Sequence, residues 1–246
     1  MKTLPAPYAS YGFCEAHARA FGTTAYKTAY LIQDHPAEFF GAILNNEPMG
    51  YYPPSTICVE ARRHGVRIVG PSVNRSSREV IVEGGEIVLP LKMISGMTEG
   101  AIEAIMKERE KGRFQSFTDF AKRVRLPVNI VQSMVLCGAF DELGVSRRQL
   151  VWFLTEKQGD GRADAGDLGA PLLVEDLPDC VSLAGPDYTL AEKIGFEYDV
   201  LGLSVSGHPM EVWRTRLKEG GFVDSLQLEQ IETGQRIKVG GIPVRP

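Results

Sequence analysis

LKMISGMTEGAIEAIMKEREKG, residues 91–112, is the stretch that decides how this chain is interpreted. It has the form of a helix-hairpin-helix: a short apolar helix, then a tight turn flanked by Gly96 and Gly100, then a second helix that opens on small residues. Thr98 is placed to cap the second helix, and apolar residues recur on one face of it as far as Glu110. The two glycines predict a close backbone approach to another molecule.

The chemistry expected of this hairpin is phosphate binding. The N–H groups of the turn and of the first helical turn lack partners and point outward, where they can cradle one phosphate with help from the helix dipole. Such a site reads the DNA backbone and not the bases, so binding is independent of sequence and sensitive to salt. The alternative is an ordinary helical turn with glycine as a breaker, and Glu99 counts against phosphate binding. The predicted DNA contacts here are Lys92, Ser95, Gly96, Met97, Thr98, Gly100, Lys107 and Arg109.

A second unit of the same kind follows in SFTDFAKRVRLPVNIVQSMVLCGAFDELG, residues 116–144. Two helices flank the turn at residues 125–127, and Lys122, Arg123 and Arg125 gather around it. A pair of such units would grip both strands of a duplex; a solvated basic helix end is the alternative. The loop that contains Asn74 and Arg75 is predicted to contact phosphate as well, although a solvated basic surface explains it equally.

The rest of the chain is expected to be mostly helical. Helical patterns cover residues 12–33, 37–45, 55–61 with Ser55 as N-cap, 98–110, 117–124 with Ser116 as N-cap, 127–136, 146–157, 189–201 and 210–218. Strands are expected at residues 66–70 and on both sides of Gly84-Gly85, a dipeptide suited to a tight hairpin turn. The Ala- and aromatic-rich helices near the N-terminus are interpreted as core packing. Ile237 and Val239 start a strand with no partner left in the sequence, so the chain is expected to stop inside a domain.

Composition sets limits on function. The 246 residues are 43% hydrophobic and 24% charged, and neither a membrane-spanning run nor a signal peptide is present, which predicts a cytoplasmic protein. The four cysteines are far apart, and the four histidines lack ligand spacing, so no metal site is expected. No paired carboxylates suited to two metal ions and no Walker loop occur, so no catalytic residue is predicted.

Charge is distributed unevenly along the chain. Residues 1–154 hold 18 Lys and Arg against 15 Asp and Glu, whereas residues 155–232 hold 6 against 16. A nucleic-acid surface therefore belongs in the first 154 residues or at the C-terminal end, since the acidic middle would repel phosphate.

Residues 9–76, residues 134–144 and VLGLSVSGHPM, residues 200–210, together resemble the bacterial family C DNA polymerases, the α subunit of polymerase III and its error-prone relatives. NNEPMGYYPP, residues 45–54, is closer to the error-prone branch. The resemblance implies a mainly α fold with a small β connector and six parts. They are the C-terminal part of the fingers (1–65), the β connector (66–91), a tandem helix-hairpin-helix domain (92–157), a linker (158–187), a helical segment (188–232) and the truncated start of an OB-fold (233–246).

The resemblance also implies functional residues and partners. Tyr11, His17, Phe21 and Lys27 become candidates for the pocket of the incoming nucleotide. The family's metal-binding aspartates would lie in a palm upstream of this chain, so the chain itself would hold no cofactor while the parent enzyme would use Mg²⁺. Expected partners are duplex DNA and the palm, thumb and OB-fold of the polymerase, with no membrane. The expected function is backbone binding of duplex DNA within a polymerase of replication or error-prone repair; the alternative is a stand-alone, non-catalytic DNA-binding or scaffold protein.

Overall fold

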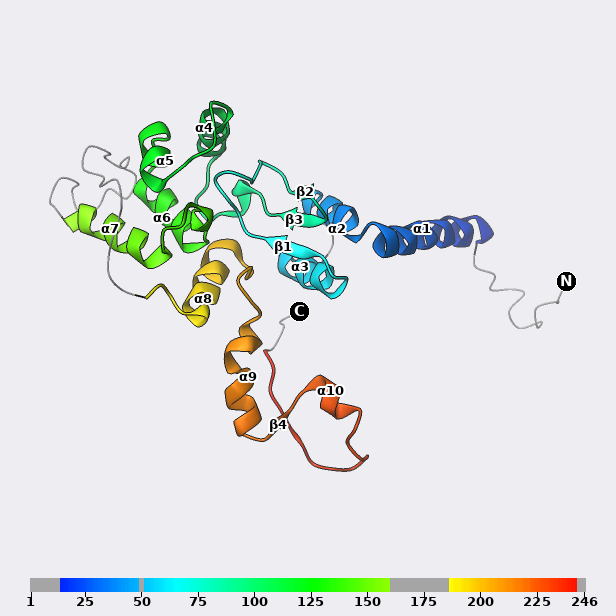
Figure 1. The fold of residues 1–246 in the computed structure, drawn as a ribbon. Helices are drawn as coiled ribbons and strands as arrows, with labels where there is room; N and C mark the ends of the chain where they lie inside the picture. The colour runs from blue at the N-terminus through cyan, green and yellow to red at the C-terminus, as the bar shows by residue number, and fades with distance from the viewer. Residues whose placement is uncertain (1–13, 49–50, 160–185, 243–246) are drawn as a thin grey trace. The chain divides into compact units, whose positions relative to one another are not determined.

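The computed structural model of the chain describes residues 14–48, 51–159 and 186–242 (Figure 1). It is mainly helical with a small sheet, which confirms the predicted fold class. The chain forms two compact units. The first comprises residues 1–67 and 82–87, and the second comprises residues 68–81 and 88–246.

The first unit is built from α1 (Glu15–Asp34), α2 (Pro36–Asn45) and α3 (Pro54–Arg63). α2 and α3 each begin with proline at the first helical position, where the missing N–H costs nothing. Their buried faces meet through Phe40 and Leu44 of α2 and Ile57 and Ala61 of α3. The prediction that Ser55 caps α3 is wrong, because the helix begins at Pro54 with Pro53 as its N-cap, so that Ser55 lies inside it.

α1 differs from the other helices of this unit because none of its residues is buried. Phe21, Tyr26 and Tyr30 are 64%, 75% and 54% exposed. The expectation that this Ala- and aromatic-rich helix packs into a core is therefore wrong for the described residues. Periodicity identifies an apolar face, but it does not show that any element covers that face.

A three-stranded sheet has the order β1-β3-β2, formed by β1 (Arg67–Val69), β2 (Ile81–Glu83) and β3 (Glu86–Val88). The predicted Gly84-Gly85 hairpin joins β2 to β3, and both glycines have positive φ, 59° and 81°. Leu89 extends the pairing after β3, since its N–H donates to the carbonyl oxygen of Val69 at 2.9 Å.

The core of the second unit lies among α4 (Glu99–Glu110), α5 (Phe117–Arg123), α6 (Val128–Leu136) and α7 (Arg147–Gly159). Two short 3-10 helices, η2 (Leu91–Met93) and η3 (Asp141–Leu143), connect these elements. Phe120 packs against Phe114 and Phe140 with ring centroids 5.1 and 4.9 Å apart. Thr98 and Ser116 cap α4 and α5, as predicted, by accepting bonds from the N–H groups three residues later.

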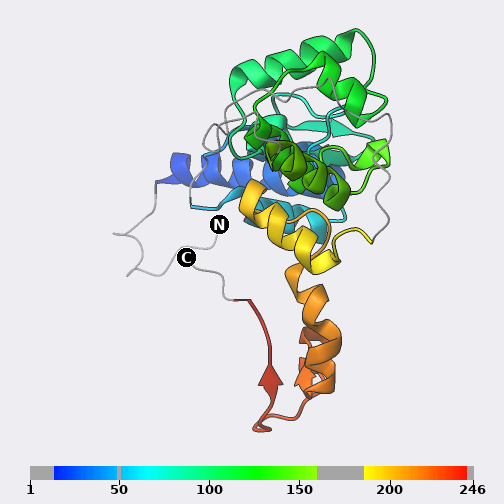
Figure 2. The same ribbon diagram turned by 90° about the vertical axis from the view of Figure 1, so that its left-hand side faces the viewer.

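α8 (Leu190–Leu201) lies beside α6 in both views (Figures 1 and 2). Its N-terminus has a complete capping box between Thr189 and Glu192. α9 (Pro209–Glu219), β4 (Phe222–Val223), α10 (Ser225–Leu228) and β5 (Lys238–Val239) follow. The expectation that the last strand has no partner is wrong, because β5 pairs in parallel with β4, with Phe222 opposite Lys238.

Candidate nucleic-acid interface

The first hairpin, residues 94–100 between η2 and α4, presents a group of unpartnered backbone donors. Gly96 has φ of +80°, a conformation that side chains rarely adopt, and it turns the chain sharply before Thr98. The N–H groups of Gly96, Thr98, Glu99 and Gly100 have no acceptor among the residues that the structure describes. All four residues are exposed, so these donors face solvent at the positive end of the α4 dipole.

Space around this hairpin is open. A Cβ added at Gly100 would meet no atom within 4 Å, and the backbone there is an ordinary helical one. Glycine at position 100 is therefore not required by packing in the described structure. A ligand that approaches the helix N-terminus closely would explain it, because a side chain at this position would stand in the way of a phosphate.

The acidic residues beside the hairpin are both paired with Arg78, which offsets part of their negative charge. Its Nε lies 3.1 Å from Oε2 of Glu99, and its Nη2 lies 3.0 Å from Oε1 of Glu103. Glu99, which counted against phosphate binding in the sequence, is thus part of a surface ion pair. Lys92 is similarly paired with Glu79. Arg78 was not among the predicted contacts, and no local pattern could have revealed partners 21 and 25 residues further along the chain.

The second hairpin, residues 124–129 between α5 and α6, is built differently. It contains no glycine, and Pro127 with φ of −53° is the N-cap of α6. Two exposed residues of this hairpin, Arg125 and Asn129, have N–H groups without an acceptor among the described residues. Lys122 and Arg125 are exposed, and neither has an ion-pair partner in the described part of the chain. Positive charge therefore dominates this hairpin.

Arg109 and Arg123, two predicted DNA contacts, are engaged by the protein's own backbone. Arg109 Nη1 donates to the carbonyl oxygen of Ser76 at 2.6 Å. Arg123 donates to the carbonyl oxygens of Glu108 and of Gly112, the latter at 2.8 Å, and its guanidinium lies 4.4 Å from the centre of the Phe114 ring. These bonds tie the end of α4 to its neighbours, so both guanidinium groups help to hold the hairpins in place.

Asn74 has a similar structural engagement. Its side-chain amide donates to the carbonyl oxygen of Phe114 at 2.9 Å and accepts from the N–H of Phe114 at 2.8 Å. Arg75 beside it is half-buried, and its backbone N–H donates to Ser72 Oγ at 3.1 Å. Of the remaining predicted contacts, Ser95 is exposed and Met97 is half-buried in the first hairpin, whereas Lys107 is exposed in the last turn of α4.

Electrostatics around the hairpins follow from these pairs. The hydrogen bond from Lys111 is the main cause that lowers the pKa of Glu108, and the charges of Lys111 and Arg123 lower it further. Glu108 therefore remains ionised and keeps Arg123 oriented at neutral pH. Burial raises the pKa of the Cys137 thiol to about 12, so this cysteine carries no thiolate and is not a nucleophile.

The candidates for a nucleotide pocket fall on α1 or outside the described residues. Tyr11 lies outside them. His17 and Phe21 are exposed and adjacent, with ring centroids 4.3 Å apart. Lys27 is exposed on the same helix, but at 3.6 residues per turn it points about 80° away from His17 around the axis. The structure therefore groups His17 with Phe21 and leaves Lys27 on another side of α1.

No cluster of three or more His, Cys, Asp or Glu residues suited to a metal ion occurs in residues 14–48, 51–159 and 186–242. Among the same residues, no helix is both long enough and apolar enough to span a membrane.

Known proteins are similar to this chain in sequence. A family model described as "Helix-hairpin-helix motif" matches residues 65–150, which include both hairpins. An error-prone DNA polymerase of Symbiobacterium thermophilum is 36% identical over an alignment that is 280 positions long with its gaps and covers 97% of this chain and 26% of that protein. This chain is homologous to bacterial error-prone DNA polymerases. The predicted resemblance to family C DNA polymerases is thereby confirmed.

Further relatives agree with this assignment. Error-prone DNA polymerases of Corynebacterium glutamicum and Ralstonia nicotianae are 32% and 34% identical, and each alignment covers 96% of this chain. The same alignments cover 21% and 22% of those proteins. The chain thus spans about a fifth to a quarter of the length of the curated relatives that it matches.

Proposed function

We propose that this chain supplies sequence-independent binding of duplex DNA to a DNA polymerase of the error-prone type. The observation that carries the proposal is the group of four outward-facing N–H donors at residues 96–100, on an exposed helix N-terminus with open space around Gly100. A phosphate is the DNA group that such donors recognise. The homology to error-prone polymerases and the helix-hairpin-helix match support DNA as the source of that phosphate.

The second hairpin would contribute mainly through charge. Lys122 and Arg125 would neutralise phosphates and release counterions, which gives binding a steep salt dependence. Base edges play no part in either contact, because phosphate contacts fix position without carrying sequence information. The chain would therefore hold a duplex at any sequence, as an enzyme that advances along DNA requires.

Catalysis would belong to other segments of the polymerase. The described residues hold no carboxylate cluster that fits a catalytic Mg²⁺, so no chemical step is assigned to this chain. The exposed side of α1 that carries His17 and Phe21 would pack against those other segments and bring His17 towards an incoming nucleotide. A cytoplasmic location follows from this role in DNA synthesis.

Fluorescence anisotropy with a labelled 20-base-pair duplex across a salt series tests the proposal. We expect a dissociation constant in the micromolar range or weaker near physiological salt, as for non-specific binding generally, and a steep rise with salt. Gly100→Val should weaken binding strongly without unfolding the chain. Gly22→Val is the matched control, because Gly22 in α1 is also an exposed helical glycine with no atom within 4 Å of an added Cβ.

Two results would contradict the proposal: no binding at low salt, or equal effects of the two glycine substitutions. Nucleotide incorporation distinguishes the polymerase assignment from a stand-alone DNA-binding protein. If this chain belongs to a polymerase, a second fragment that carries the family's palm should incorporate nucleotides better when the chain is added. A scaffold protein would leave incorporation unchanged.

A further inference from the structure

The first hairpin is bonded to a helix that lies outside the matched helix-hairpin-helix region. The N–H of Ser95 donates to the carbonyl oxygen of Val200 at 3.0 Å. Val200 is in the last turn of α8, where backbone carbonyls lack partners within their own helix. Residues 65–150 match the family model, so this bond joins the hairpin to a segment 50 residues beyond the match.

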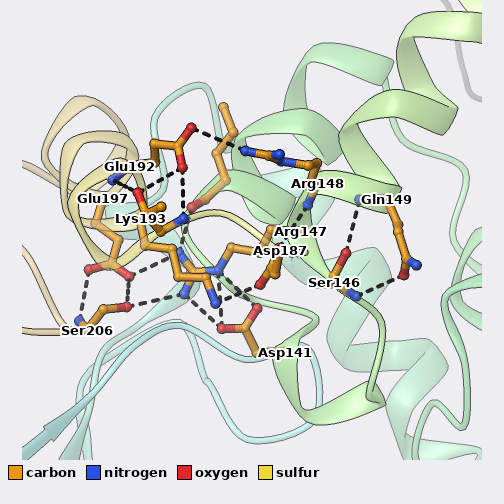
Figure 3. Close-up of polar contacts among 12 residues, drawn as sticks. Asp141, Ser146, Arg147, Arg148, Gln149, Asp187, Glu192, Lys193, Glu197 and Ser206 are labelled. Carbon is orange, nitrogen blue, oxygen red and sulfur yellow. Dashed lines mark hydrogen bonds and ion pairs between the residues drawn. The ribbon is translucent and has the colours of Figure 1, made fainter. Parts of the chain in front are cut away.

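α8 is held in position by a buried ion pair with α7. Arg147 Nη1 lies 3.0 Å from Oε1 of Glu197, and their side chains are 4% and 0% exposed (Figure 3). Arg147 also donates to the carbonyl oxygen of Leu136 at 3.0 Å and binds the carboxylate of Asp141 through Nε and Nη2. One guanidinium therefore connects α6, η3, α7 and α8.

Glu197 is satisfied on both oxygens. Its Oε2 accepts bonds from the Ser204 hydroxyl and from the N–H groups of Val205 and Ser206, at 2.8–2.9 Å. Its Oε1 accepts from the Ser206 hydroxyl as well as from Arg147. Burial alone would raise the pKa of Glu197, but these hydrogen bonds lower it overall, so the carboxylate stays charged at neutral pH.

The loop after α8 also fits closely against the rest of the second unit. A Cβ added at Gly70 would lie 3.0 Å from Cγ2 of Val205. At Gly138, which has φ of +84°, an added Cβ would lie 2.3 Å from Nη2 of Arg147. Glycine at both positions allows the arginine and the loop to approach the backbone. The position of α8, and with it the carbonyl that holds Ser95, is thus fixed from several sides.

We infer that residues 197–206 form a brace for the first hairpin, and that Glu197 is a positioning residue for DNA binding. The brace is the set of contacts from Glu197 to Arg147 and to residues 204–206, together with the Ser95–Val200 bond. It holds the N–H groups of residues 96–100 in one arrangement, so that a phosphate meets donors already in place. The DNA-binding part of this inference rests on the proposed function.

The test is a double-mutant cycle in the full chain, measured by anisotropy with the same duplex. Glu197→Gln keeps the size of the side chain and removes its charge, and we expect binding to weaken about two- to thirtyfold, the range of couplings transmitted through packed networks. In the Gly100→Val background, Glu197→Gln should cause no further loss, because the hairpin no longer binds. In the Lys122→Gln background the full loss should remain, because the second hairpin is separate.

Two variants provide controls. Glu192→Gln lies on the same helix, breaks an exposed ion pair with Arg148 and preserves the capping box, so it should leave binding unchanged. Arg147→Lys retains the charge but loses the planar fork, and it should weaken binding less than Glu197→Gln. Circular dichroism establishes that each variant is folded.

Hydrogen exchange of the Ser95 amide gives an independent readout. It should be faster in Glu197→Gln than in the parent chain, while the exchange rate in Glu192→Gln stays unchanged. The inference would be overturned if Glu197→Gln weakened the binding of the Gly100→Val variant as much as it weakens that of the parent chain. Unchanged hydrogen exchange of the Ser95 amide in Glu197→Gln would overturn it as well. If the parent chain bound no duplex at all, the proposed function would fail; faster exchange at Ser95 would then still support the brace, and unchanged exchange would overturn it.

Discussion

The two hairpins of the second unit each place a turn before the start of a helix, but they differ in their turn residues and in their charge. The first turns at Gly96, in a left-handed conformation, and presents four unpartnered N–H groups. The second turns through Pro127 without any glycine, presents two such groups, and carries the exposed cations Lys122 and Arg125. The first is therefore suited to bind a phosphate by directed hydrogen bonds, and the second to attract phosphates by charge. Substitutions in the two hairpins should therefore change the salt dependence of DNA binding to different extents.

The largest effect is expected from Gly96→Val. A β-branched residue at φ of +80° is strained, so the turn must rearrange and the directed donors are lost. Because hydrogen bonds to charged groups contribute about 1.5–3 kcal/mol each, duplex affinity should fall by roughly tenfold or more. Gly84→Val is the control, since Gly84 has φ of +59° in the β2–β3 turn and should be strained without affecting DNA binding. Equal losses from both variants would show that strain alone is responsible.

A smaller effect is expected from replacing the charges of the second hairpin. Lys122→Gln combined with Arg125→Gln should weaken binding about five- to tenfold at low salt and reduce the slope of log K against log salt by about 1–2. Arg214→Gln combined with Lys218→Gln removes the same net charge from exposed positions of α9 and should leave the slope unchanged. An unchanged slope in the hairpin variant would remove the second hairpin from the interface.

Arg78→Gln tests how the first hairpin tolerates its acidic neighbours. Without the arginine, the carboxylates of Glu99 and Glu103 would repel an approaching phosphate. Binding should weaken about two- to fivefold at low salt, and the difference should disappear at high salt because exposed charges are screened. Adding Glu99→Gln and Glu103→Gln should restore affinity. Failure of this rescue would mean that Arg78 contacts DNA directly.

Gly100→Ala should give the smallest effect, with stability and binding changing in opposite directions. Alanine favours the helix by up to about 0.5–1 kcal/mol over glycine, and the added Cβ meets nothing in the protein. The free energy of unfolding in urea should therefore rise slightly, while anisotropy shows binding weakened by about twofold. A more stable variant with unchanged affinity would show that no ligand approaches this position closely.

The sequence predicted those parts of the fold that depend on neighbouring residues. Thr98 and Ser116 were identified as caps, and Gly84-Gly85 as a hairpin turn, because each of these signals acts within about four positions. The ties that fix the hairpins could not be predicted in this way. Asn74 bonds to Phe114, 40 residues away, and Arg147 bonds to Glu197, 50 residues away.

In the candidate site, too, features set by neighbouring residues could be predicted from the sequence, and features set by distant residues could not. The exposed donors of the first hairpin follow from its glycines and its cap, so residues 95–100 could be selected from sequence. Counting basic residues near a turn could not separate Lys122, which is exposed, from Arg123, whose guanidinium is bonded to backbone carbonyls. Likewise, the many Ala and aromatic residues of α1 predicted burial, whereas none of the residues of this helix is buried in the described structure.

The most direct test of the account follows the backbone amides themselves. In an NMR titration of the ¹⁵N-labelled chain with a 20-base-pair duplex, phosphate binding by the first hairpin predicts the largest changes in amide proton chemical shift at Gly96, Thr98, Glu99 and Gly100. Arg125 and Asn129 should shift less, and shifts at both hairpins should shrink as salt is added. Shifts confined to lysine- and arginine-rich surfaces, with the amides of residues 96–100 unmoved at saturation, would contradict phosphate binding by the first hairpin.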